Sequence, residues 1–94
     1  MAHIVIWHQV ENFDQWKSKF DEHGATRGEA GSKGGTVYRS ADNSQEVVIV
    51  LEWDNEENAR AFIASQHLAE AMTDAGVTGQ PMVAFLDEGE AVPA

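Results

Sequence analysis

Alternating apolar and polar positions predict four β-strands along the chain. Residues 46–53 (EVVIVLEW) and 3–10 (HIVIWHQV) carry large apolar side chains on both faces, which is typical of central strands that are covered on both sides. Shorter apolar patterns over residues 36–40 and 82–87 predict two further strands. Pro81 directly precedes the last of them, which favours an edge strand because proline cannot donate a ladder hydrogen bond.

A spacing of three and four residues predicts an amphipathic helix over residues 12–28, with Asn12 as its N-cap and Gln15 at the capping-box position. At about 100° per residue, one stripe of this helix spans an arc of roughly 80°. The stripe consists of Phe13, Trp16, Phe20, His23 and Arg27. It begins apolar and ends polar, so we expect the functional site beneath the C-terminal half of the helix.

A second helix is predicted after the strand that ends at Trp53, with Asp54 as its cap and Glu57 at the capping-box position. Its apolar stripe changes phase between Ile63 and Leu68, a step of five residues that a regular helix cannot keep on one face. Ser65 lies at this change and can cap a new segment, which predicts a kink or a restart there.

The resulting order β-α-β-β-α-β predicts an α+β, ferredoxin-like fold, with a four-stranded antiparallel sheet and both helices on one face. We expect one domain over residues 1–88 and a frayed tail over residues 89–94. In the first strand, His8 shares a face with Ile4, which we assign to the helix side. The opposite face remains apolar, so the pattern predicts a homodimer formed sheet against sheet.

Charge and composition exclude several classes of protein. The net charge of −10 argues against a nucleic-acid partner, which would require clustered lysine and arginine. The absence of cysteine excludes disulfides, thiol catalysis and thiolate metal sites. No segment approaches the length of a membrane span, so we expect a cytoplasmic protein without a membrane partner. The glycine-rich residues 27–35 follow a helix and lack P-loop spacing, which favours a plain connection.

The chain resembles the dimeric α+β barrel superfamily, and within it the antibiotic biosynthesis monooxygenase-like proteins. The resemblance lies in residues 6–16 (IWHQVENFDQW), 20–23 (FDEH) with Arg27, 52–54 (EWD), 65–68 (SQHL) and 76–77 (GV). It implies a pocket between sheet and helices in each protomer, in a superfamily of cofactor-free monooxygenases, haem-degrading enzymes, isomerases and polyketide cyclases. The haem-degrading branch is a poor match. It places an Asn on the first strand and a Trp and a His on the second helix, whereas this chain has His8 or Gln9 on the strand and Phe62 on the helix.

Three polar residues are predicted to converge on this pocket: His8, His23 and Arg27 are the candidate catalytic groups. Each would be costly to bury without a partner or a ligand. The competing interpretation is structural, with Arg27 paired to a carboxylate such as Glu52 and both histidines half exposed. A metal site of the two histidines and a carboxylate lacks any short-spaced ligand pair, so we expect no metal and no cofactor.

Aromatic side chains are the candidate walls of the pocket, although such residues more often belong to a core. The predicted substrate-binding residues are Trp16, Phe20, Tyr38, Trp53 and Phe62. Tyr38 could donate a proton to a bound carbonyl or phenolate, and His67 is expected at the surface.

The sequence thus predicts a small cofactor-independent enzyme, of monooxygenase, isomerase or cyclase type, that acts on an aromatic or polyketide-like molecule. A histidine would act as general base and Arg27 would hold the resulting oxyanion. The alternatives are a non-catalytic homodimer, either a stress-associated protein or one that binds a small hydrophobic molecule, and a domain whose own side chains fill the pocket.

Overall fold

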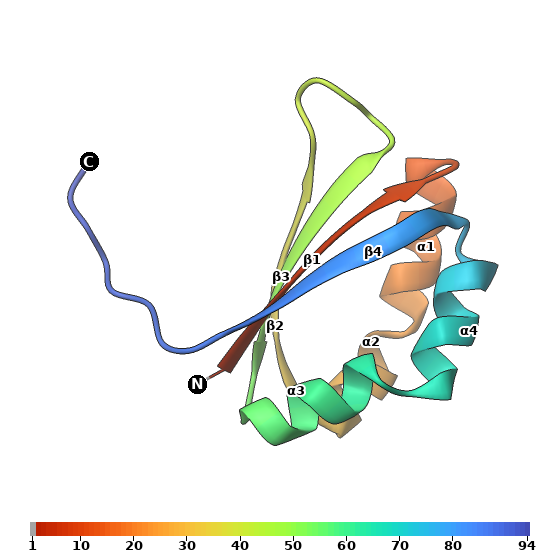
Figure 1. Cartoon of the computed structure of the whole chain (residues 1–94). Coiled ribbons are helices and arrows are strands. Elements are labelled where there is room, and N and C mark those ends of the chain that lie inside the picture. The colour runs from red at the N-terminus through yellow and green to blue at the C-terminus, as the bar shows by residue number, and fades with distance from the viewer. Residues whose placement is uncertain (1) are drawn as a thin grey trace.

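Four antiparallel strands form one sheet in the order β2-β3-β1-β4, and the helices cover one of its faces (Figure 1). The computed structural model describes residues 2–94. The elements are β1 (Ala2–Val10), α1 (Phe13–Glu22), α2 (Gly24–Ala30), β2 (Ser32–Arg39), β3 (Glu46–Trp53), α3 (Glu56–Ile63), α4 (Gln66–Asp74) and β4 (Val77–Leu86). This arrangement confirms the predicted ferredoxin-like α+β fold.

The two strands predicted as central, β1 and β3, lie side by side in the middle of the sheet. Along both strands, side chains that face the helices alternate with side chains that face the other side of the sheet, because successive residues of a strand point to opposite faces. The buried core comprises Ala2, Ile4, Ile6, Val10, Trp16, Val47, Ile49, Leu51, Trp53 and Ala59. His8 lies in the same row of β1, so one polar side chain is embedded in the core face.

Each predicted helix is divided into two. Ser65 begins α4 by accepting a hydrogen bond from the Leu68 N–H, which confirms the predicted restart. The continuous helix expected over residues 12–28 is wrong. It stops at His23, whose backbone (φ −87°, ψ 5°) leaves the α-helical region just before Gly24, a poor helix former.

The predicted N-cap is right for α1 and wrong for α3. Asn12 accepts a hydrogen bond from the Gln15 N–H, as expected of an N-cap. The cap of α3 is Asn55, which accepts from the Asn58 N–H, and not Asp54. The Asp54 carboxylate instead accepts from the Asn55 N–H and from the side-chain amide of Asn58.

Both edge strands are longer than predicted. The strand β2 begins at Ser32 because glycine allows a close approach: a Cβ at Gly35 would collide with the backbone of Val50 and Leu51 on β3. The strand β4 begins at Val77, so Pro81 lies within it and not at its start. Pro81 is tolerated because β4 is an edge strand whose register with β1 shifts nearby.

The face of the sheet away from the helices is open in the single chain. Register places the side chains of Trp7, Tyr38 and Met82 together on this face, because Trp7 and Tyr38 both pair with Val48 and Trp7 pairs with Met82. They are 45%, 57% and 62% exposed, which is unusual for large apolar side chains gathered in one place.

Among residues 2–94, no helix combines the length and the apolar composition needed to cross a bilayer.

Candidate functional site

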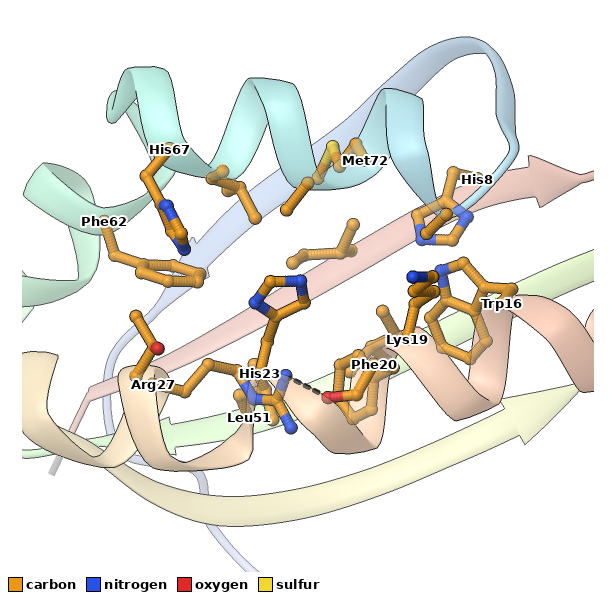
Figure 2. Close-up of a pocket in the computed structure, with 16 residues that line it drawn as sticks. His8, Trp16, Lys19, Phe20, His23, Arg27, Leu51, Phe62, His67 and Met72 are labelled. Atoms are coloured by element: carbon orange, nitrogen blue, oxygen red, sulfur yellow. Dashed lines mark hydrogen bonds between the residues drawn. The ribbon is translucent and has the colours of Figure 1, made fainter.

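A pocket of about 60 Å³ lies between the sheet and helices α1, α2 and α4; we call it the aromatic pocket. Figure 2 shows its polar groups spread along the pocket, with His8 near Trp16 at one end, Arg27 at the other and His23 between them. Among its lining residues are the predicted His8, Trp16, Phe20, His23, Arg27 and Phe62. The structure therefore brings together all three predicted catalytic side chains and three of the five predicted substrate-binding side chains.

His8 is the most buried polar side chain of the pocket, only 4% exposed. Its ring meets the Trp16 ring edge to face, with centroids 5.4 Å apart. Its Nδ1 has no hydrogen-bond partner among the described residues, a costly arrangement for a buried nitrogen. Burial lowers the pKa of His8, and an interaction with its own backbone opposes this shift. The lowered pKa favours the neutral imidazole, which is the form that can accept a proton.

The lowered pKa of His8 makes the stability of the protein depend on pH. In the unfolded chain the imidazole takes up a proton as the pH falls below about 6.5, whereas in the folded chain it stays neutral until the pH is lower. Because the unfolded state then binds more protons, the free energy of unfolding should fall as the pH drops below about 6.5. Urea unfolding of the wild type and of His8→Gln between pH 7.5 and 5 measures this. A wild-type dependence no steeper than that of the variant would contradict it.

A row of stacked side chains connects the buried histidine to the arginine. The rings of Trp16 and Phe20 stack with centroids 5.0 Å apart, and the Arg27 guanidinium lies 3.6 Å above the Phe20 ring. The row arises from the helical spacing of Trp16 and Phe20 together with the turn at His23, which carries Arg27 back over Phe20. It gives the aromatic pocket one flat wall.

The Arg27 side chain donates one hydrogen bond to another described residue, from Nη1 to the Phe20 carbonyl oxygen, at 2.7 Å. None of the salt bridges between residues 2–94 involves it. The alternative in which Arg27 forms a salt bridge with Glu52 is wrong. Glu52 lies opposite His3 on β1 and Gly34 on β2 in the strand register, and its side chain points to the open face of the sheet. Burial lowers the pKa of Arg27, opposed by the charge of Asp21. A half-buried cation thus faces the pocket with no carboxylate of the described residues within salt-bridge distance, although Asp21 is close enough for its charge to act on it.

Two basic residues that were not predicted as site residues, His67 and Lys19, also line the pocket. His67 is exposed, as expected, but it also lines the aromatic pocket, and its ring meets that of His23 edge to face at 5.5 Å. Lys19 lines the same rim. Helical spacing could have indicated both, because Lys19 is three residues after Trp16 and His67 is four before Ala71, another lining residue.

Two predicted substrate-binding residues lie elsewhere. Trp53 is on the expected face of β3, but it is fully buried at the strand end, 5.0 Å from the Phe62 ring, and it does not line the pocket. Tyr38 lies on the open face of the sheet because its register position opposes Val48. Its placement on the pocket wall is therefore wrong for this chain.

Within residues 2–94, no three histidine, aspartate or glutamate side chains gather closely enough to hold a metal ion.

Comparisons with known proteins agree on the family and on the fold. The sequence profile of a family described as antibiotic biosynthesis monooxygenase matches residues 1–74. No curated protein sequence matches the chain.

Solved structures similar to this fold include proteins of different descriptions. SnoaB, a cofactor-independent oxygenase from Streptomyces nogalater, is 18% identical over 99% of this chain and 97% of its own, with a TM-score of 0.76. The ActVA-Orf6 monooxygenase of Streptomyces coelicolor, solved with nanaomycin D, is 21% identical over 99% and 92%, with a TM-score of 0.65. A conserved protein from Methanosarcina mazei is 16% identical over 94% and 92%, with a TM-score of 0.62. At such identities the likeness shows the shared fold.

Proposed function

Because the chain belongs to the antibiotic biosynthesis monooxygenase family, we propose that it is a cofactor-independent oxygenase of an aromatic, polyketide-like small molecule. His8 is the proposed general base, and Arg27 holds a negatively charged oxygen of the substrate. The rings of Trp16, Phe20 and Phe62 contact the substrate ring. The descriptions of SnoaB as a cofactor-independent oxygenase and of ActVA-Orf6 as a monooxygenase solved with nanaomycin D support this class of reaction.

One observation carries the proposal: within residues 2–94, a buried imidazole whose Nδ1 has no hydrogen-bond partner lines the same apolar pocket as an arginine that forms no salt bridge. A buried histidine with a purely structural role would normally form hydrogen bonds through both ring nitrogens. A structural arginine in such a position would normally have an acidic partner. A ligand with an acidic proton and an anionic oxygen would satisfy both groups.

The proposed reaction needs only the substrate and molecular oxygen. His8 takes a proton from an activated CH₂ flanked by aromatic rings, which leaves a carbanion and an imidazolium. The carbanion reduces O₂ and forms a C–O bond, and the imidazolium returns the proton to the resulting peroxide. Loss of water from the hydroperoxide leaves a ketone, so that R₂CH₂ and O₂ become R₂C=O and H₂O. Holding the negative charge on a substrate oxygen stabilises the carbanion.

The aromatic pocket must widen to accept such a substrate. A cavity of roughly 150 Å³ is needed for a benzene ring, whereas this pocket holds about 60 Å³. Met72 lies on its α4 side, and a methionine changes its conformation at little cost (Figure 2). The exposed His67 borders the same opening, so the α4 side is where we expect the widening.

Oxygen uptake with dihydroxyanthrone, an anthrone with an activated CH₂, tests the proposal. The wild-type protein should consume one O₂ for each anthraquinone formed, faster than the spontaneous oxidation measured with heat-denatured protein. Saturable binding of the anthrone without any excess oxygen uptake would instead favour the non-catalytic binding protein. Neither binding nor uptake would favour a pocket filled by its own side chains.

We also propose that the open face of the sheet pairs with the same face of a second copy. The exposed Trp7, Tyr38, Met82 and Leu86 share this face, and a two-fold contact would cover them in both copies. Native mass spectrometry at about 10 μM should show a dimer.

The dimer should be lost when a charge is placed in the middle of that face. Trp7→Glu inserts a carboxylate that cannot be buried without a partner, so we expect the monomer to predominate. Ala69→Glu, on the exposed side of α4, adds the same charge away from the sheet and should leave the dimer intact. A wild-type monomer at this concentration, or a dimer that survives Trp7→Glu, would contradict the proposal.

A further inference from the structure

A second cavity, of about 290 Å³, lies on the other side of Arg27, between α2 and β2. We call it the glycine cavity, because its lining includes Gly24, Gly28, Gly34 and Gly35. Two of these positions leave open space, because Cβ atoms at Gly28 and Gly34 would meet no atom within 4 Å, whereas a Cβ at Gly35 would collide with the β3 backbone. The cavity is several times larger than the aromatic pocket, and the reaction proposed above does not use it.

The two cavities share one wall. Phe20, Arg27 and Leu51 line both of them, and the Arg27 guanidinium stacked on the Phe20 ring forms part of that wall. Arg27 is held there by its single hydrogen bond to the Phe20 carbonyl. A molecule that reaches from one cavity into the other must therefore pass the guanidinium.

The glycine cavity has one charged side chain in its lining, and that is Arg27. The other polar residues of the lining are Ser32 and Thr36, and Thr36, two residues before Tyr38 on β2, directs its side chain to the open face of the sheet. A Cβ at Gly24 would lie 3.7 Å from the Arg27 Nη2, so the absence of a side chain at Gly24 leaves this nitrogen approachable. A guanidinium presents five N–H donors in a plane that matches a carboxylate, and one bond to a carbonyl leaves donors for it.

We propose that the glycine cavity binds a short carboxylate side chain of the aromatic substrate, and that this carboxylate supplies the negatively charged oxygen held by Arg27. This inference rests on the proposed function in placing the substrate ring in the aromatic pocket. It makes the substrate an aromatic acid. His8, beside Trp16 at the far end of the aromatic pocket, would then face the ring at a distance from the carboxylate (Figure 2).

Binding of naphthylacetate and of its neutral analogue naphthylacetamide tests the inference, because the two differ in charge and hardly in size. Isothermal titration calorimetry with the wild type should show the acid binding about tenfold more tightly than the amide, the scale of a partly exposed charge-assisted pair. Arg27→Met keeps an extended side chain over Phe20 without the charge, and should remove the preference. Arg27→Lys keeps the charge without the planar fork, and should retain part of it.

A second variant tests the place of the carboxylate. Gly28→Leu keeps Arg27 but fills the glycine cavity, and α2 accepts leucine well. It should also remove the preference for the acid. An acid that binds no better than the amide to the wild type, or a preference that survives Arg27→Met or Gly28→Leu, would overturn the inference. The titration measures no turnover, so a missing preference beside normal oxidation of dihydroxyanthrone contradicts this inference alone, and a clear preference without oxygen uptake contradicts the proposed function alone.

Discussion

Replacing His8 by glutamine should lower the rate of dihydroxyanthrone oxidation by about a hundredfold or more, the usual contribution of a general base. Glutamine approximates the size and polarity of histidine but cannot accept a proton near neutral pH. The loss should appear in kcat, because the neutral side chain still fills its place beside Trp16. Oxygen uptake under steady-state conditions measures it. Because burial lowers the pKa of His8, the wild-type rate should also persist below pH 6.5 before it falls.

His3→Gln is the matched control for this substitution. His3 lies on the same strand as His8, but its register position opposes Glu52 on the open face, away from the aromatic pocket. It should oxidise the anthrone at the wild-type rate. If His8→Gln retained the wild-type kcat while His23→Gln lost it, His23 would be the base. Wild-type turnover in both variants would refute general-base catalysis by these histidines.

Replacing Trp53 by alanine should destabilise the fold by about 3–5 kcal/mol, the cost of truncating a large buried aromatic side chain. Trp53 is fully buried at the end of β3 and packs against Phe62. For a domain of this size such a loss lowers the melting temperature by tens of degrees or prevents folding. Thermal unfolding followed by circular dichroism at a fixed protein concentration measures the effect.

Trp53→Phe separates the packing of this ring from its polar atom. The indole Nε1 of Trp53 has no hydrogen-bond partner among the described residues, so phenylalanine removes a buried, unpaired donor together with part of the ring. We expect a loss below about 1.5 kcal/mol for this exchange of one aromatic ring for another. If Trp53→Ala and Trp53→Phe lowered the free energy of unfolding equally, the Nε1 would have a hydrogen-bond partner whose loss matters more than the packing of the ring.

The sequence predicted correctly those features that depend on residues close together in the chain, such as helix caps and the alternation of side chains along a strand. Asn12 and Ser65 were found as caps because their side chains bond to an N–H three residues on, which spacing alone reveals. The alternation in β1 and β3 fixed which side chains face the helices, and so placed His8 correctly. Asp54 and Asn55 are both good caps and adjacent, so sequence could not separate them. That choice depends on where the chain leaves β3.

The predictions that failed depend on geometry between elements. Tyr38 was misplaced because the start of β2 is set by the contact of Gly35 with the β3 backbone, and that contact fixes which residues oppose one another. Trp53 was given the right face but the wrong depth, because α3 covers the end of its strand. The alternative in which Arg27 pairs with Glu52 failed because the carbonyl of Phe20, seven residues earlier in the chain, accepts the hydrogen bond of the Arg27 side chain.

The irregular pairing of β1 with β4 bears on how this protein could be modified. Trp7 pairs with Met82 and Gln9 with Thr78, so His8 alone on β1 faces three residues of β4, at positions 79–81. His8 therefore borders an irregularly paired segment of an edge strand. Residues can be inserted or removed in such a segment without disturbing the core. Insertions and deletions at positions 79–81 would therefore offer a way to change the surroundings of His8, and with them the reaction, without replacing any residue that lines the aromatic pocket.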